Sequence, residues 1–408
     1  MRCNYLTLGN MVKRKICYGI VQPGQSVTDG IPVIKVNNLI SGLKSLSELD
    51  TTTRENEAKY IRTRLHGGEL IISVVGTIGK TAIVPKSFAG CNLVRATALI
   101  DIEDALLSKW VKYYIDSPYG QSYIEQNLNT TVQPTLNIKS LEKMSIPLYD
   151  TEYMEKNVLL LSSLDEKIAI NRAINENLER QAQALFKECF IDSPDILSWQ
   201  KGTFSKLIEK TISGDWGKET PSGSNTEMVY CIRGADIPEV RIGNKGKMPI
   251  RYILPKNFVS KQLVAGDIVV EISGGSPTQS TGRAAAISKA LLARYDKGMV
   301  CTNFCKALKP IDGYSMFVYH YWQYLYDKGV FFSYENGTTG IKNLDINGFI
   351  ETEPIFIAPK EMVRNFDAVC LSVFSKVYAN GLENEELALL RDTLLPKLMS
   401  GEIDVSNV

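Results

Sequence analysis

Apolar side chains recur with helical spacing over residues 151–192, which contain neither Gly nor Pro. The seam positions advance in alternating steps of three and four, at Leu161, Leu164, Ile168, Asn171, Asn175, Leu178, Ala182 and Leu185. Such spacing is typical of a coiled-coil seam. Asn171 and Asn175 fall on the same seam, and a buried Asn weakens a seam but fixes its register. We expect one long helix that ends before Pro194, because the residue before a proline avoids helical geometry.

A second stretch with the same spacing follows Pro359, with seam positions at Val363, Phe366, Val373 and Val377. The pair Asn380-Gly381 is expected to end this helix, and a shorter helix should follow with Leu387, Leu390 and Leu394 on one face. The matched places of the two stretches predict that they pair antiparallel through their seams. The alternative is that each packs only on its own domain.

Between these stretches the apolar runs are short and strand-like, and they occur twice. Residues 31–36 and 68–73 in the first half match residues 228–232 and 266–270 in the second. Each half then has a Thr/Asn-rich stretch, at 129–138 and 336–344, and an aromatic helical stretch that is expected to be core. The offset of roughly 200 residues indicates an internal repeat.

The repeat predicts an α+β fold of two similar mixed α/β domains, related by a pseudo-two-fold internal repeat and separated by two long helices that pair as an antiparallel coiled coil. The expected segments are 1–150, 151–192, 193–358 and 359–408. A protein built from two similar units usually presents two similar surfaces to a partner that itself has two sites.

Charge follows the repeat, although the 408-residue chain has a net charge of only +1. Basic minus acidic residues give 17 − 13 = +4 for residues 1–150 and 5 − 8 = −3 for 151–192. The same difference is 19 − 16 = +3 for 193–358 and 5 − 8 = −3 for 359–408. Two mildly basic units suit a polyanion, whereas the acidic helices do not.

Composition places the chain among ordinary globular proteins, with 44% hydrophobic and 22% charged residues. No apolar run approaches the roughly 18 residues that span a bilayer, and the N-terminus has no signal-peptide core. The eight cysteines are scattered without a C-x-x-C motif. We expect a cytoplasmic protein with reduced thiols and no membrane association.

Three motifs that resemble catalytic signatures are incomplete. Residues 76–81 resemble the end of a phosphate-binding loop, but Val74 stands where its first Gly is required and 82–84 continue as a strand. Residues 116–119 resemble the D-P-P-Y motif of adenine methyltransferases, but Ser117 replaces a proline, which favours a helix-end turn. Residues 165–167 supply only a fragment of a nuclease site and lie on the seam helix.

Metal chemistry has equally little support, because the two histidines, His66 and His320, have no Cys or His neighbour at ligand spacing. We therefore expect no metal, no cofactor and no catalytic residues in this chain.

The ends of both helical stretches carry specific motifs. Gln181-Ala182-Gln183-Ala184-Leu185-Phe186-Lys187, with Phe190-Ile191-Asp192 after it, closes the first, and residues 390–403 close the second with the sequence LRDTLLPKLMSGEI. Both strongly resemble the conserved regions of the specificity subunit of Type I restriction–modification systems. The resemblance covers the whole length of the chain. Within the recognition domains it concerns the order of the domains and helices and not the sequence.

The resemblance implies that two target-recognition domains each read one half of a bipartite double-stranded DNA sequence. The helices would fix the gap between the half-sites and dock two methyltransferase subunits. Those partners would carry S-adenosylmethionine, and restriction–translocase subunits would supply ATP- and Mg-dependent chemistry.

Polar side chains in loops that flank the strands are the candidates for reading base edges in the major groove and contacting phosphates. The alternative for each is a solvated loop residue without a role in binding. In the first domain they are Lys35, Asn37, Asn38, Lys80, Arg95, Thr131 and Gln133. In the second they are Arg233, Thr278, Gln279, Arg283, Asn303, Thr339, Lys342 and Asn343. The nine Leu, Ile, Val and Phe residues of the two seams named above are the candidates for helix pairing and partner docking.

Two other classes of function remain open. One is a coiled-coil adaptor whose two domains bind proteins or glycans, and the other is a self-contained methyltransferase or nuclease. Steeply salt-dependent DNA binding separates the first from a DNA reader, and a methylation assay on the isolated chain tests the second.

Overall fold

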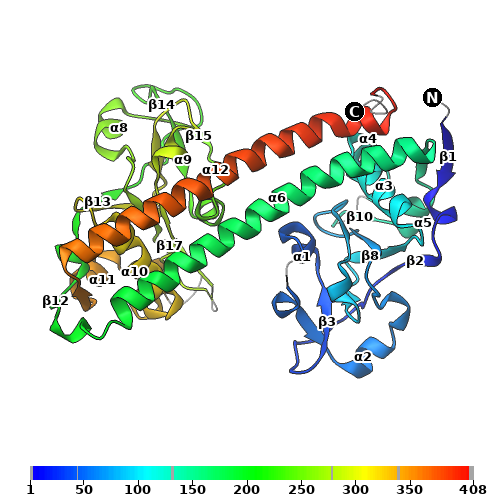
Figure 1. Cartoon of the computed structure of the whole chain (residues 1–408). Helices are drawn as coiled ribbons and strands as arrows, with labels where there is room; N and C mark the ends of the chain where they lie inside the picture. Colours follow the sequence, from blue (N-terminus) through cyan, green and yellow to red (C-terminus); the bar gives the residue numbers. More distant parts are fainter. Residues whose placement is uncertain (1–2, 44, 130–132, 277–278, 338–340, 404–408) are drawn as a thin grey trace. The chain divides into compact units, whose positions relative to one another are not determined.

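The computed structural model describes residues 3–43, 45–129, 133–276, 279–337 and 341–403, coloured along the chain in Figure 1. The chain forms two compact units. Unit 1 consists of Met1–Glu166 with Ala388–Val408, and unit 2 consists of Lys167–Leu387. Each unit therefore combines one mixed α/β domain with a part of both long helices.

Unit 1 is built on a four-stranded antiparallel sheet with the order β2-β8-β5-β6 (Arg14–Tyr18, Thr97–Asp101, Leu70–Ser73, Thr81–Ile83). A second sheet has the order β4-β3-β7 (Asp50–Thr52, Ile31–Ile34, Asn92–Leu93), in which β3 and β7 are parallel. The pairs β1-β11 (Asn4–Thr7, Ser145–Leu148) and β9-β10 (Leu128–Asn129, Thr135–Leu136) complete the strands.

The helices of unit 1 follow from local signals in the sequence. Asp104 caps α3 (Ala105–Asp116) by accepting a 2.9 Å hydrogen bond from the Leu107 N–H. On α3, Trp110 is fully buried and its ring N–H donates to the Pro147 carbonyl at 2.8 Å. The remaining helices are α1 (Val36–Ser41), α2 (Arg54–Ala58), α4 (Pro118–Gln126) and α5 (Ile138–Glu142).

Unit 2 repeats these sheets with one additional strand, β17. Its four-stranded sheet has the order β13-β20-β16-β18 (Ile208–Ser213, Cys305–Pro310, Ile268–Glu271, Ala284–Ala286). Its three-stranded sheet has the order β15-β14-β19 (Ile250–Ile253, Glu227–Ile232, Met299–Cys301), with β14 and β19 parallel. The others are β12-β23 (Gln200–Gly202, Ile355–Ile357) and β17-β22-β21 (Ser273–Gly274, Lys342–Leu344, Glu335–Asn336).

The helices of unit 2 repeat part of the same plan. Helix α10 (Ser315–Asp327) carries the second aromatic stretch, in which Tyr319 and Trp322 are fully buried. The shorter helices are α7 (Ile237–Arg241), α8 (Pro255–Lys261), α9 (Lys289–Leu292) and α11 (Ile346–Thr352). The expectation that both aromatic stretches are core is confirmed.

The register of the parallel strands shows which residue of unit 2 corresponds to each residue of unit 1. Ile34 lies opposite Leu93 in unit 1, and Ile232 lies opposite Cys301 in unit 2. Residues on β3 therefore correspond to residues 198 positions later (232 − 34), and residues on β7 to residues 208 positions later (301 − 93). All four predicted strand runs contain a strand, and the α+β fold with an internal repeat is confirmed.

The two long helices are α6 (Thr151–Phe186), which continues into a π-helical turn at Lys187–Ile191, and α12 (Lys360–Met399). In unit 1, the Tyr153 hydroxyl donates to the Leu398 carbonyl at 2.8 Å, and Arg391 forms a 2.7 Å salt bridge with Asp165. The start of α6 thus packs along the end of α12, as expected for an antiparallel pair (Figure 1).

Unit 2 contains the opposite ends of the same helices. Asn171 donates to the side-chain oxygen of Asn384 at 3.1 Å, and Phe186 of α6 packs its ring 5.8 Å from that of Phe366 on α12. The antiparallel pairing through the predicted seams is therefore confirmed in each unit.

One prediction about α12 is wrong, because the helix does not end at Asn380-Gly381 but runs without a break to Met399. A Cβ on Gly381 would lie 1.9 Å from the carbonyl oxygen of Gly243. The glycine therefore allows a close approach between the helix and this loop. The separate shorter helix that was expected to carry Leu387, Leu390 and Leu394 is therefore the last part of α12, where Leu390 is exposed and Leu395 and Leu398 are buried.

Candidate nucleic-acid interface

A surface hollow of about 590 Å³ lies in unit 1 where β3 and β7 end. Parallel strands end at the same edge of a sheet, so the residues that follow them meet there. Lys35 follows β3 and Arg95 lies two residues after β7. The lining residues are Ile20, Val21, Pro23, Lys35, Val36, Asn37, Val75, Val94, Arg95, Ala96, Gln133 and Thr135.

Backbone hydrogen bonds hold the loops of this hollow in place. The Val94 N–H donates to the Ile34 carbonyl at 3.2 Å, and the Arg95 N–H donates to the Ile20 carbonyl at 2.8 Å. The Asn38 side chain accepts a 2.7 Å hydrogen bond from the Lys35 N–H and so fixes the start of α1. The Arg95 side chain is thereby presented to solvent from an ordered loop.

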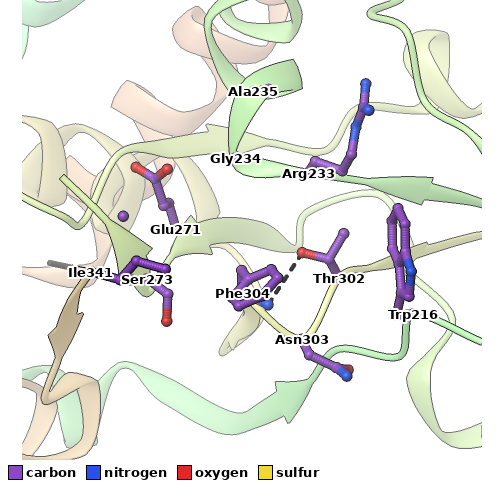
Figure 2. Close-up of a pocket in the computed structure, with 11 residues that line it drawn as sticks. Trp216, Arg233, Gly234, Ala235, Glu271, Ser273, Thr302, Asn303, Phe304 and Ile341 are labelled. Atoms are coloured by element: carbon purple, nitrogen blue, oxygen red, sulfur yellow. Dashed lines mark hydrogen bonds between the residues drawn. The ribbon is translucent and has the colours of Figure 1, made fainter.

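Unit 2 has a hollow of about 520 Å³ at the equivalent place (Figure 2). The lining residues are Trp216, Arg233, Gly234, Ala235, Glu271, Ser273, Gly274, Thr302, Asn303, Phe304 and Ile341. By the offsets above, Arg233 corresponds to Lys35 (35 + 198) and Asn303 to Arg95 (95 + 208). The two units therefore each have a hollow at the same place on the same fold.

The cations around the hollow of unit 2 are held in ion pairs. Arg233 binds Asp236 at 2.9 Å and 3.1 Å, and Arg283 binds the buried Glu271 through two hydrogen bonds of 2.7 Å. Hydrogen bonding to these carboxylates holds the pKa of both guanidinium groups above its ordinary value. Lys342 donates to Glu335 at 2.7 Å.

Unit 1 differs, because Arg95 and Lys80 are exposed and form no ion pair with any residue that the structure describes. Lys35 is paired with Asp50, and its hydrogen bond lowers the pKa of that carboxyl group. The exposed charge of the first hollow is therefore carried mainly by Arg95.

The candidates from sequence divide into several groups. Six line the hollows, namely Lys35, Asn37, Arg95, Gln133, Arg233 and Asn303. Asn38 and Arg283 have the structural partners described above. Lys80, Gln279, Lys342 and Asn343 lie on turns or strands outside the lining, and Asn343 accepts a hydrogen bond from Ser273. Thr131, Thr278 and Thr339 lie outside the described residues.

Aromatic residues of the second hollow were not predicted from the sequence. Trp216 is held by Arg251, whose guanidinium carbon lies 4.1 Å from the ring centroid and whose Nε donates to the Trp216 carbonyl at 2.9 Å. Phe304 is 61% exposed. The signal in the sequence is an aromatic residue in a polar segment, which contains glycines around Trp216 but none around Phe304.

The seam residues lie inside the helix pair in their own units. Leu161, Ile168, Val363, Phe366 and Val377 are buried, and Leu164, Leu178, Leu185 and Val373 are half-buried. They hold the helices together. Apolar side chains that remain exposed on the two helices include Leu159, Ile170, Leu371 and Leu389.

The incomplete catalytic motifs have structural explanations. Ser117 ends α3 and caps α4, and Thr81 donates to Asp116, so the expected helix-end turn is confirmed. Residues 81–83 form β6 rather than a helix. No group of three or more His, Cys, Asp or Glu residues in the described part of the chain could hold a metal ion. None of the described helices is long and apolar enough to cross a membrane.

The chain thus contains two copies of one α+β domain, each with a hollow at the equivalent place and each in a unit with part of both long helices. Residues 25–180 match the family described as Type I restriction modification DNA specificity domain. The chain is similar over more than half of its length to proteins named as Type I restriction enzyme specificity subunits.

Curated relatives are named as Type I restriction enzyme specificity subunits. The chain is 27% identical over 225 residues to the Type I restriction enzyme EcoBI specificity subunit of Escherichia coli, covering 54% of this chain and 44% of that protein. It is 25% identical over 325 residues to the MjaIX specificity subunit of Methanocaldococcus jannaschii, covering 75% of this chain and 71% of that protein. The chain thus spans less than half of the first of these relatives.

Among solved structures, the S subunit of the Type I restriction–modification system from M. genitalium is similar, with a TM-score of 0.55. The two are 15% identical, and the match covers 98% of this chain and 96% of that one. At this identity the likeness supports the fold alone.

Proposed function

We propose that this chain is the DNA sequence-recognition subunit of a Type I restriction–modification complex. Each recognition domain, 1–150 and 193–358, reads one half of a bipartite double-stranded DNA target in the major groove. The helical regions, 151–192 and 359–408, fix the gap between the half-sites and dock two methyltransferase subunits. S-adenosylmethionine, ATP and Mg belong to the methyltransferase and restriction–translocase partners, and the complex acts in the cytoplasm.

The observation that carries this proposal is the repetition of the hollow. The same parallel strand ends present Lys35 and Arg95 in one unit and Arg233 and Asn303 in the other. Arg and Asn are side chains that pair with two atoms of a base edge, Arg with guanine and Asn with adenine. Two equivalent polar sites on mildly basic domains suit two stretches of one duplex.

The mechanism that we propose divides the work between side chains. Exposed cations such as Arg95 and Lys80 contact phosphates or base edges, while Asn37, Gln133 and Asn303 select bases by hydrogen bonding. Asn38 and Arg283 act through the loops that they hold, not by direct contact. Gln279, Lys342 and Asn343 remain candidates at the edge of the second site, together with Thr131, Thr278 and Thr339.

The rival is an adaptor whose two domains bind proteins or glycans, and salt dependence separates the two. Phosphate contacts release counterions, so the logarithm of DNA affinity falls steeply with the logarithm of salt concentration. Replacing Arg95 by Ala should weaken binding and reduce the salt slope by about 1. The matched control is Arg54→Ala, which removes an exposed arginine outside the hollow. DNA binding without a salt slope, or equal effects of both variants, contradicts the proposal.

A further inference from the structure

The two hollows are equivalent in position but different in chemistry. Ala96 in unit 1 corresponds to Phe304 in unit 2 (96 + 208), just as Arg95 corresponds to Asn303. Val21 and Trp216 both line their hollows in the segment that leads to the sheet edge. Unit 1 therefore has an arginine where unit 2 has a neutral amide, and small side chains where unit 2 has aromatic rings.

Electrostatics strengthens this contrast. Around the second hollow, Arg233, Arg283 and Lys342 are each paired with a carboxylate of the same unit. Around the first, Arg95 forms no ion pair with a described residue and is exposed. A strong hydrogen-bond donor is thus available in unit 1, whereas these three cations around the hollow of unit 2 already have partners.

The aromatic side chains of the second hollow are held in ordered loops. The Phe304 carbonyl accepts from the N–H groups of Ile272 at 2.9 Å and Ser273 at 3.3 Å, and its own N–H donates to the Thr302 hydroxyl at 3.3 Å. Figure 2 shows Trp216 and Ile341 at opposite ends of the hollow, with loop 302–304 between them. A backbone held in this way presents the exposed ring of Phe304 from a loop that needs little ordering on binding.

We infer that the two domains read different base edges, and this inference rests on the proposed function. The hollow of unit 2 packs Phe304, supported by Trp216, against the C5-methyl group of thymine. The hollow of unit 1 uses Arg95 to donate to O6 and N7 of guanine. These are the base edges that apolar and arginine side chains distinguish in the major groove. The two half-sites are therefore different sequences.

Selection from a DNA library tests the assignment. The full chain, assembled with its methyltransferase partners, selects from duplexes in which both half-sites are random. Arg95→Ala should lose a G·C preference in one half-site, and Phe304→Ala should lose a T·A preference in the other. Arg54→Ala and Val259→Ala, which alter exposed side chains outside the hollows, should keep the wild-type preferences.

Deoxyuridine then isolates the methyl group, because it differs from thymidine only at C5. Replacing thymidine in the half-site that responds to Phe304→Ala should weaken wild-type binding about fourfold, equivalent to ~0.8 kcal/mol for one apolar carbon. The same replacement should leave the Phe304→Ala complex unchanged. Equal wild-type affinity for both bases, or no T·A preference in either half-site, overturns the inference.

A wrong assignment of bases and a wrong proposed function would give different experimental results. If salt-dependent DNA binding persists while these base preferences are absent, only the assignment of bases is wrong. If the assembled complex shows no salt-dependent binding to any duplex, the proposed function itself is wrong.

Discussion

The side-chain amide of Asn380 donates a 2.8 Å hydrogen bond to the amide oxygen of Asn175, inside the helix pair of unit 2. Both side chains are almost fully buried. Asn175 in turn donates to the carbonyls of Val377 at 2.9 Å and Ile242 at 3.0 Å. These bonds can form only in one register of the two helices, as expected for a buried Asn in an apolar seam.

Removing one partner of this pair should destabilise the protein. Asn380→Ala leaves the Asn175 oxygen buried without its donor, at a cost of about 1–3 kcal/mol in the free energy of unfolding. Urea denaturation of Asn380→Ala, Asn175→Ala and the double variant forms a cycle whose coupling energy should be at least ~0.5 kcal/mol. The exposed Arg172→Ala on the same helix is the control. Additive effects would mean that the two residues do not act together.

Gly381 provides a prediction in which two effects have opposite signs. Alanine in place of glycine inside a helix ordinarily stabilises by up to ~1 kcal/mol. Here the new Cβ would meet the Gly243 carbonyl oxygen at 1.9 Å, and Arg294 holds that same oxygen at 2.6 Å. Overpacking of this kind costs about 1–3 kcal/mol, so Gly381→Ala should lower the thermal unfolding midpoint. A raised midpoint would show that the loop moves freely.

The stability of unit 2 should depend on pH through His320. Burial lowers the pKa of this imidazole to about 3, and Gln183 lies 2.9 Å from its Nδ1. The unfolded chain binds a proton below pH ~6.5, whereas the folded chain does not until about pH 3. Stability is therefore complete above pH ~6.5 and falls by up to roughly 1.4 kcal/mol per pH unit toward pH 3.

Asp367 contributes the opposite slope, which requires a difference measurement. Burial raises the pKa of this carboxyl group to about 6, so the folded state binds the additional proton between pH ~4 and 6. Comparing urea midpoints of the wild type and His320→Asn at several pH values cancels this contribution. The difference in stability between the two should shrink as the pH falls from 6.5. A constant difference would contradict the buried neutral state of His320.

Partner docking should depend on apolar side chains that the helix pair leaves exposed. Leu389 on α12 in unit 1 is 70% exposed. If a methyltransferase subunit covers this side chain, Leu389→Glu should raise the dissociation constant of the complex at least tenfold, because burial of a leucine stabilises by ~1.5 kcal/mol or more. Calorimetric titration measures the dissociation constant, with Leu197→Glu, at a side chain that is 82% exposed, as control. Equal affinities for both variants would place the docking surface elsewhere.

The sequence predicts the helix pair well because its signals are periodic and local. Leu161, Asn175 and Phe366 were placed on the seam by spacing alone, and the structure buries all three. The predicted end at Asn380-Gly381 is wrong because Asn-Gly is only a local helix-ending signal. Contact between Gly381 and Gly243, far apart in sequence, overrides that signal.

The site is less predictable, because the role of a polar side chain depends on its neighbours in space. Arg95 and Arg283 are both candidates in the sequence, yet only Arg283 is bound by a buried carboxylate, that of Glu271. Trp216 and Phe304 were not among the candidates, because aromatic residues are usually core. Only the folded chain reveals that both reach the hollow.

The central claim is that this chain selects a bipartite DNA sequence for modification. The most direct test is an adenine-methylation map of the source genome with and without the gene for this chain, in a host that expresses the partner subunits. The account predicts that deletion abolishes methylation at one motif of two different short half-sites separated by a fixed gap. An unchanged map in cells that contain the assembled complex would contradict it.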